Sequence, residues 1–202
     1  MGLHRCCLFA VASLIAASSV GACTSFSADT TTSSSEAGTD GGAEAGGVNL
    51  LRDPSFELPG CSGPWSSNGA RVVDDSAPRS GQRSCRVCGQ AGQSVWDVSQ
   101  DVQVGPIAPG ATYVGDAWVR ALADGTAPPP VSIRVSTRDG TGVTLEGVES
   151  SSLGTFLDAT WSHIVVSLPV TKPGATGLQV NVIARDVGGC FLVDDATLMP
   201  LP

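Results

Sequence analysis

Four cysteines in the second part of the chain could form covalent links: Cys61, Cys85, Cys88 and Cys190. Four cysteines in an exported domain predict two disulfide bonds. The spacing of Cys85 and Cys88 would also suit a metal knuckle or a redox pair, but the sequence offers no second Cys-x-x-Cys and no βαβ context. In a strand these two positions point to opposite faces, so we expect them to bond to different partners. Three connectivities stay open.

The residue types needed for catalysis are sparse. His163 is the only histidine beyond the N-terminal segment, and its alternation with Trp161 and Val165 is more typical of a structural position in a strand. The paired acids are Asp74-Asp75 and Asp194-Asp195. Neighbours in a strand point apart, whereas the two carboxylates of a glycosidase face each other across about 5 to 9.5 Å. No Gly-x-Ser-x-Gly motif occurs. We expect no enzyme.

The elements that position these residues are predicted to be short strands. Apolar residues alternate with polar ones in Val131–Arg138, where Arg134 and Arg138 share the polar face, and again in Gly177–Arg185. Such alternation is typical of half-buried antiparallel strands. Asp139-Gly140 after the first of these predicts a hairpin. Eight or nine strands in about 155 residues predict an all-β fold, an antiparallel β-sandwich of the jelly-roll type.

The order of the pieces along the domain is similar to that of a known family. The pieces are Asn49 to Glu57, Trp65, Ser80 to Ser84, Gln100 with Val102 and Val104, Pro109 to Tyr113, Ala117 to Arg120, Trp161, and Phe191 to Asp195. This series resembles the CenC-type carbohydrate-binding modules of the galactose-binding-domain-like β-sandwich superfamily. The resemblance covers essentially the whole domain, and it implies a binding module.

The resemblance also implies a structural calcium ion that joins the first strand to the last. Its ligands in this chain would be Glu57 and Asp194, with backbone carbonyls completing the shell. Calcium takes 6 to 8 oxygen ligands, so this set is suitable. The alternative is that Glu57 caps a turn and Asp194 is a solvated strand residue. Asp195 would point to the opposite face of a regular strand, which makes it the less suitable ligand.

Sugar binding in such modules usually uses aromatic rings, because the CH face of a pyranose is apolar. In the strand Thr112 to Leu122, Trp118 shares a face with Asp116 and Arg120, which is the pattern of a binding platform. The alternative, which the pattern favours slightly, is that Trp118 belongs to the core. Trp65 and Trp96 flank loops, and either would border a site. The candidate ligand-binding residues are Trp118, Trp96 and Arg134.

The N-terminus is typical of an exported protein. Met1 to Arg5 carries positive charge, and Cys6 to Val20 is uncharged and mostly apolar, as in a signal peptide. Val20-Gly-Ala-Cys23 resembles the bacterial lipobox, which predicts cleavage after residue 22 and lipidation of Cys23. An ordinary signal peptide with a chance cysteine is the alternative. Residues 23–47 are rich in Ser, Thr, Gly and Ala, which predicts a disordered tether.

The remaining residues, 48–202, fit one domain of ordinary size. They hold 10 basic and 15 acidic residues, a formal charge of −5 that disfavours nucleic-acid binding. We therefore expect a non-catalytic lipoprotein that binds a polysaccharide or envelope glycan and contacts the membrane through its lipid. Thr24 after the anchor, in place of Asp, favours the outer membrane. The alternative is an envelope structural or protein-interaction module that keeps the fold without sugar binding.

Overall fold

The structure is a computed structural model that describes residues 47–61, 63–68, 70–74, 77–123, 127–153, 159–185 and 188–202, with residues 70–74 described by their backbone alone. The predicted signal peptide, Cys23 and most of the tether lie outside these residues. Within the described part, no helix is long and apolar enough to cross a membrane.

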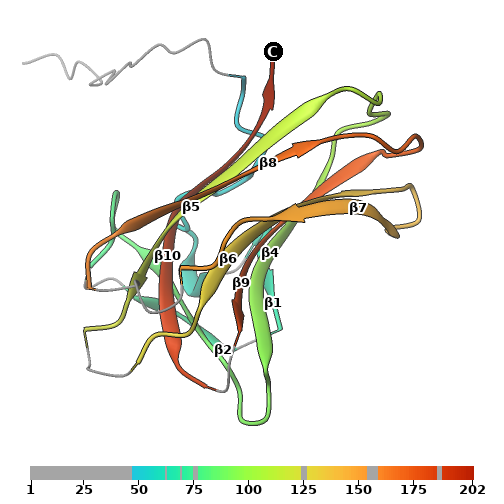
Figure 1. Cartoon of the computed structure of the whole chain (residues 1–202). Coiled ribbons are helices and arrows are strands. Elements are labelled where there is room, and N and C mark those ends of the chain that lie inside the picture. The colour runs from blue at the N-terminus through green and yellow to red at the C-terminus, as the bar shows by residue number, and fades with distance from the viewer. Residues whose placement is uncertain are drawn as a thin grey trace, which may run out of the picture. The chain divides into compact units, whose positions relative to one another are not determined.

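Ten strands in the described residues form two five-stranded antiparallel sheets (Figure 1). After a 3-10 turn, η1 (Pro59–Cys61), they are β1 (Ser66–Ser67), β2 (Ala70–Asp74), β3 (Ser84–Cys88), β4 (Val95–Gln103), β5 (Thr112–Ala121), β6 (Val131–Arg138), β7 (Thr144–Glu149), β8 (Ser162–Pro169), β9 (Gly177–Arg185) and β10 (Cys190–Leu201). Sheet A has the order β1-β4-β9-β6-β7, and sheet B has the order β2-β3-β10-β5-β8. Most connections cross between the sheets. This confirms the predicted antiparallel sandwich.

The hydrophobic core lies between the sheets because each central strand alternates. In β6, Val131, Ile133 and Val135 are all fully buried in this core. In β9, which lies beside β6 in sheet A, Leu178, Val180 and Val182 are buried in the same core. Both strands begin and end at the predicted residues. Their polar residues consequently form the outer face of sheet A.

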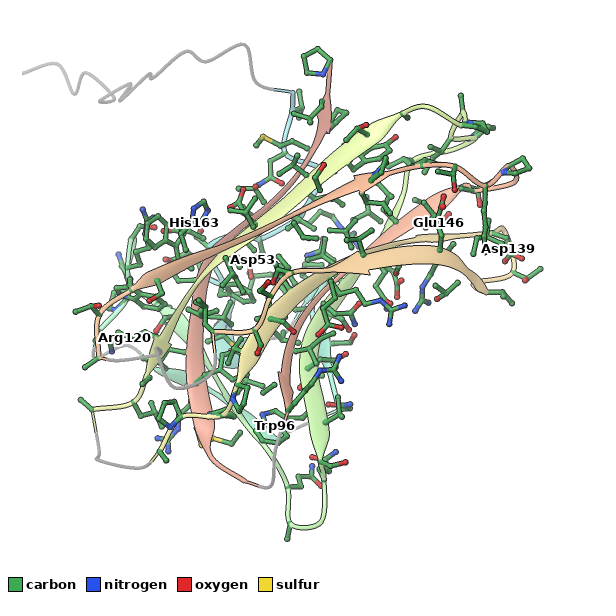
Figure 2. All side chains as sticks on the ribbon, in the orientation of Figure 1. Asp53, Trp96, Arg120, Asp139, Glu146 and His163 are labelled. Atoms are coloured by element: carbon green, nitrogen blue, oxygen red, sulfur yellow. A yellow bond between two sulfur atoms is a disulfide. The ribbon has the colours of Figure 1, made fainter. Side chains whose placement is uncertain are left out.

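The hairpin predicted at Asp139 joins β6 to β7 (Figure 2). The Asp139 carboxylate accepts hydrogen bonds from the Oγ1 and N–H of Thr141 and from the N–H of Val143. These bonds hold the pKa of Asp139 below its usual value. The side chain therefore fixes the turn by mimicking backbone pairing, as short Asp side chains do in loops.

Two disulfides resolve the open connectivity: Cys61 bonds to Cys85, and Cys88 bonds to Cys190. Cys85 faces the core and is fully buried, whereas Cys88 lies on the other side of β3 and pairs in register with Cys190 of β10. The prediction that Cys85 and Cys88 bond to different partners is confirmed. The bonds fasten β3, the second strand of sheet B, to η1 and to the central strand β10.

The N-terminal segment is held by both sheets. The Leu50 N–H donates to the Leu198 carbonyl oxygen, and the Leu198 N–H donates to Asn49 Oδ1, which joins the segment to β10. On the other side, the Gln100 side chain accepts from the Arg52 N–H at 2.8 Å and donates to the Arg52 carbonyl at 2.9 Å. Gln100 is buried, and these paired bonds satisfy its amide.

Candidate functional site

The outer face of sheet A carries polar side chains across its whole width. Strand register aligns Ser99 of β4, Asn181 of β9, Arg134 of β6 and Glu149 of β7 in one row. The polar residues of this face are Asp97, Ser99, Asp101, Ser132, Arg134, Ser136, Arg138, Glu149, Gln179, Asn181 and Arg185. A surface of this kind offers many hydrogen-bond donors and acceptors in fixed positions.

Short side chains form the floor of this face. Ser132 and Ser136 are only 1% exposed, and Asn181 is 9% exposed, although all three point away from the core. The Ser132 hydroxyl donates to Glu149 Oε1 at 2.5 Å. Arg134 also lies across Gly147, where an added Cβ would come within 3.0 Å of the guanidinium Nε. Glycine at position 147 therefore leaves the room that the Arg134 side chain occupies.

Most charges on this face are neutralised by a neighbour. The Arg138 guanidinium lies 3.3 Å from Asp101, and Arg185 lies 2.6 Å from Glu149. Burial acts to raise the pKa of Glu149, but hydrogen bonds from Arg185 and Ser132 hold it below its usual value. The charge of Arg134, which lies opposite Glu149 in register, also helps to lower this pKa.

Arg134 differs from its neighbours because its guanidinium has no hydrogen bond or ion pair with the described residues. The side chain is half-buried at the centre of the face. Beside it, the Asn181 amide donates to Asp97 at 2.8 Å. Arginine carries five N–H donors and cannot lose its charge in a protein. Arg134 thus keeps donors available for an external oxygen ligand.

Trp118 lies on the outer face of sheet B, since Ala117 and Val119 on either side of it are fully buried in the core. Its ring is stacked on His163 with centroids 4.6 Å apart, and the Arg79 guanidinium carbon lies 3.8 Å from the ring centroid. The outward orientation matches the predicted platform, but His163 and Arg79 already pack against the ring of Trp118, where a sugar would have to stack. Trp118 and Arg134 also lie on opposite outer faces, so they do not share one site.

The structure corrects the prediction for Trp96. Its side chain is fully buried between the sheets (Figure 2), and an added Cβ on Gly89 would come within 2.9 Å of the indole. A ring in this position is part of the core and presents no face to a ligand. Trp65 is also buried, because it stacks on Phe56 and donates its indole N–H to the Asp53 carbonyl. Neither tryptophan borders a surface site.

Glu57 and Asp194, the predicted calcium ligands, reach the same loop before β3. Glu57 Oε1 accepts the N–H of Gln82 at 2.9 Å, and Asp194 Oδ2 accepts the N–H groups of Arg79 and Ser80. Burial and the nearby negative charge of Asp195 raise the pKa of Asp194 to about 6, although the backbone N–H groups oppose the shift. Both carboxylates thus bond to the same loop, and the charge of Asp194 is incompletely compensated.

Asp195 does not point away from this loop, as a regular strand would require. The register of β10 on β5 shifts between Asp194 and Thr197, and Asp195 has a positive φ of 45°. This β-bulge turns both acids toward the loop, where Asp195 forms an ion pair with Arg79 and accepts the hydroxyl of Ser80. The expected separation of the two acids is therefore wrong. Among the described residues, no group of three or more His, Cys, Asp or Glu could hold a metal by itself.

Residues 48–188 match the family model CBM_4_9, the Carbohydrate binding domain, which is more than half of the chain. The chain belongs to this carbohydrate-binding family. This assignment confirms the predicted resemblance at the level of the family. Its folded domain is a non-catalytic carbohydrate-binding module. None of the curated proteins matches the chain.

Solved structures share the fold of this module. The CBM22-1 xylan-binding domain of Paenibacillus barcinonensis Xyn10C has a TM-score of 0.57 at 19% identity, and the match covers 77% of this chain and 96% of that domain. The enzymatically active domain of bacteriophage CBA120 tailspike protein 4 has a TM-score of 0.60 at 12% identity. An arabinose-bound α-L-arabinofuranosidase has a TM-score of 0.60 at 15% identity. The match covers 76% and 79% of this chain, but only 21% and 27% of those longer chains. These identities establish the fold alone.

Proposed function

We propose that the carbohydrate-binding module holds a glycan across the outer face of sheet A, with Arg134 at the centre. The observation that supports this site is the Arg134 guanidinium, which has no hydrogen bond or salt bridge with the described residues, whereas Arg138 and Arg185 on the same face are each paired with a carboxylate. Sugars present closely spaced hydroxyls that accept from guanidinium and amide groups and donate to carboxylates. Asn181 and Asp97 beside Arg134 offer these partners. The ordered floor of serines lowers the entropic cost of binding.

Retention of the full-length protein on insoluble polysaccharides tests this function. The first probe is xylan, because a xylan-binding domain shares the fold over almost its whole length. A glycan array that includes galactans, arabinans and uronate-rich polymers extends the test to other classes. We expect retention on at least one of them. Failure to bind any glycan with calcium present would contradict the proposal and favour an envelope structural or protein-interaction module.

We also propose that Glu57 and Asp194 hold a structural calcium ion, with carbonyl oxygens of the chain completing the shell. Two carboxylates turned to one loop, and a buried Asp194 whose charge is incompletely compensated, support this site. When bound, calcium would neutralise the two carboxylates and tie the loop before β3 to the first and last segments of the domain.

Calcium is therefore expected to raise the melting temperature of the module. At about ten times a dissociation constant typical of extracellular modules, the gain is about 1.4 kcal/mol, which corresponds to roughly 3–5 °C. Thermal unfolding with calcium and with excess EDTA measures the shift. The variant Asp194→Asn should abolish it, while Asp139→Asn, at the exposed hairpin, should preserve it. An equal melting temperature under both conditions would remove calcium from the proposal.

We propose further that the module is tethered to the outer membrane by lipid on Cys23. Support comes from the sequence alone, because Cys23 lies outside the described residues. Incorporation of an alkyne-tagged palmitate in a bacterial host is expected for the full chain and absent for Cys23→Ala. The variant should also move from the membrane fraction to the soluble periplasm. Unchanged labelling, or equal membrane association of the two proteins, would argue against the anchor.

A further inference from the structure

A cavity of about 350 Å³ opens where the N-terminal segment crosses β4. Leu50 and Arg52 of the segment line one side, and Asp101, Val102 and Gln103 of β4 line the other, above the buried Gln100. We call this the edge cavity. Asp101 joins it to the outer face of sheet A, because this residue lines the cavity and its carboxylate contacts Arg138 on that face. A glycan on sheet A would therefore have direct access to the edge cavity.

The edge of β4 leaves backbone groups available beside this cavity. β1 pairs with β4 only at Val98 and Ser99, and no other described strand lies on that side. The carbonyl of Asp97 and that of Ser99 point toward β1. Backbone groups in an antiparallel strand alternate in direction, so Asp101 and Gln103 present their N–H and C=O groups to the same open side. No described residue forms a hydrogen bond with them.

The lining has the mixed chemistry that one sugar ring needs. Leu50 and Val102 are partly buried apolar side chains that pack against the core, and they offer an apolar surface for the CH groups of a pyranose. The Arg52 guanidinium and the backbone N–H and C=O groups of Asp101 and Gln103 offer donors and acceptors for hydroxyls. The Asp101 carboxylate is paired with Arg138, and the Gln103 amide lies against Gly177 of β9. The volume lies within the range of small-molecule sites.

We propose that the edge cavity is a second carbohydrate subsite, which binds one sugar residue at the end of a glycan chain that crosses sheet A. The inference extends the proposed function, since it takes the same class of ligand. An extended peptide would instead add a strand along the β4 edge, but the open stretch presents only Asp101 and Gln103 before the N-terminal segment crosses it. A compact ring fits this short stretch better than a strand does.

Backbone NMR of the full-length protein tests the subsite directly. The probes are D-xylose, D-galactose and D-glucuronate, each added up to ~100 mM because single-sugar contacts are weak. We expect at least one sugar to shift the amide signals of Asp101 and Gln103. Arg52→Ala should weaken the binding of that sugar by about tenfold, since a charged hydrogen bond is lost. Lys172→Ala, an exposed cation outside the cavity, should leave the affinity unchanged. Shifts confined to Arg134 and Asn181, or no shift with any sugar, would overturn the subsite.

Blocking the cavity separates this inference from the proposed function. Gln103→Phe places a ring in the cavity from an exposed position, and Gln103→Ala is its matched control. We expect the phenylalanine variant to bind a retained polysaccharide about tenfold more weakly than the alanine variant. If both bind equally well while Arg134→Ala fails, the sheet A site stands and the edge cavity is not a subsite. If single sugars shift Asp101 and Gln103 but no polysaccharide is retained, the cavity stands and the sheet A site fails.

Discussion

Replacing both Cys88 and Cys190 with serine is expected to lower the free energy of unfolding by about 4–5 kcal/mol. The two cysteines are 102 residues apart in sequence, so their bond closes a long loop and removes much of the entropy of the unfolded chain. Cys61 and Cys85 are only 24 residues apart, and the same reasoning gives about 3.5 kcal/mol for their removal. Chemical denaturation of the oxidised proteins measures both losses.

The prediction also states which disulfide contributes more to the free energy of unfolding: the bond between Cys88 and Cys190. Cys61 and Cys85 are fully buried, so their replacement also places hydroxyl groups in the core and adds to the entropic loss. Alanine in place of serine at these two positions removes that contribution and is the matched comparison. If neither double replacement changes stability, the four cysteines do not form these bonds in solution. If the pair nearer in sequence costs more, loop entropy is not the dominant cause.

Replacing Arg134 with alanine is expected to weaken glycan binding by about 10- to 100-fold, while Trp118→Ala leaves it within about threefold. Loss of one hydrogen-bonded charge typically costs about 1.5–3 kcal/mol in binding. Trp118 lies on the opposite outer face, and its ring is already covered by Arg79 and His163. Affinity electrophoresis with any retained soluble polysaccharide measures both variants. Comparison of these two variants therefore identifies which outer face binds the glycan.

A fold control accompanies this comparison, because both side chains are half-buried. Arg134→Lys keeps the charge and loses the planar fork, so we expect intermediate binding if the guanidinium makes paired hydrogen bonds with the glycan. Thermal unfolding should show all three variants folded at the assay temperature. Loss of binding in Trp118→Ala with retention in Arg134→Ala would move the site to sheet B.

The sequence predicts individual strands well, but it predicts their order, their register and their irregularities less well. The alternation in residues 131–138 and 177–185 identifies both strands because the core faces only one side of them. It does not show that Trp96 is core, since Asp97 and Ser99 on one side of β4 and Gln100 on the other are all polar. The bulge at Asp194 and Asp195 has no signature in a pair of acids. The burial of Trp96 and the bulge both depend on tertiary contacts.

The sequence predicts only part of the candidate site for a similar reason. The polar pattern of residues 131–138 identifies Arg134, but its neighbours Ser99, Asn181 and Glu149 come from three other strands, and only strand order and register place them in one row. Disulfide pairing also depends on register, since Cys88 and Cys190 become neighbours only when β3 and β10 pair. A regular series of polar residues in β9, Gln179 and Asn181, was the available signal for an exposed binding face.

The hydrogen bonds that hold the N-terminal segment determine how the module would respond to a mechanical force. A pull on its N-terminus would act first on the short contacts that join Asn49 and Leu50 to β10, and then on the paired bonds between Arg52 and Gln100. Peeling would stop at Cys61, which is covalently joined to Cys85. The detached segment, residues 47–60, would be about 50 Å long at most when fully extended. Such a segment would yield under tension while the strands of sheet A stay paired, but its release would open the edge cavity that Leu50 and Arg52 line.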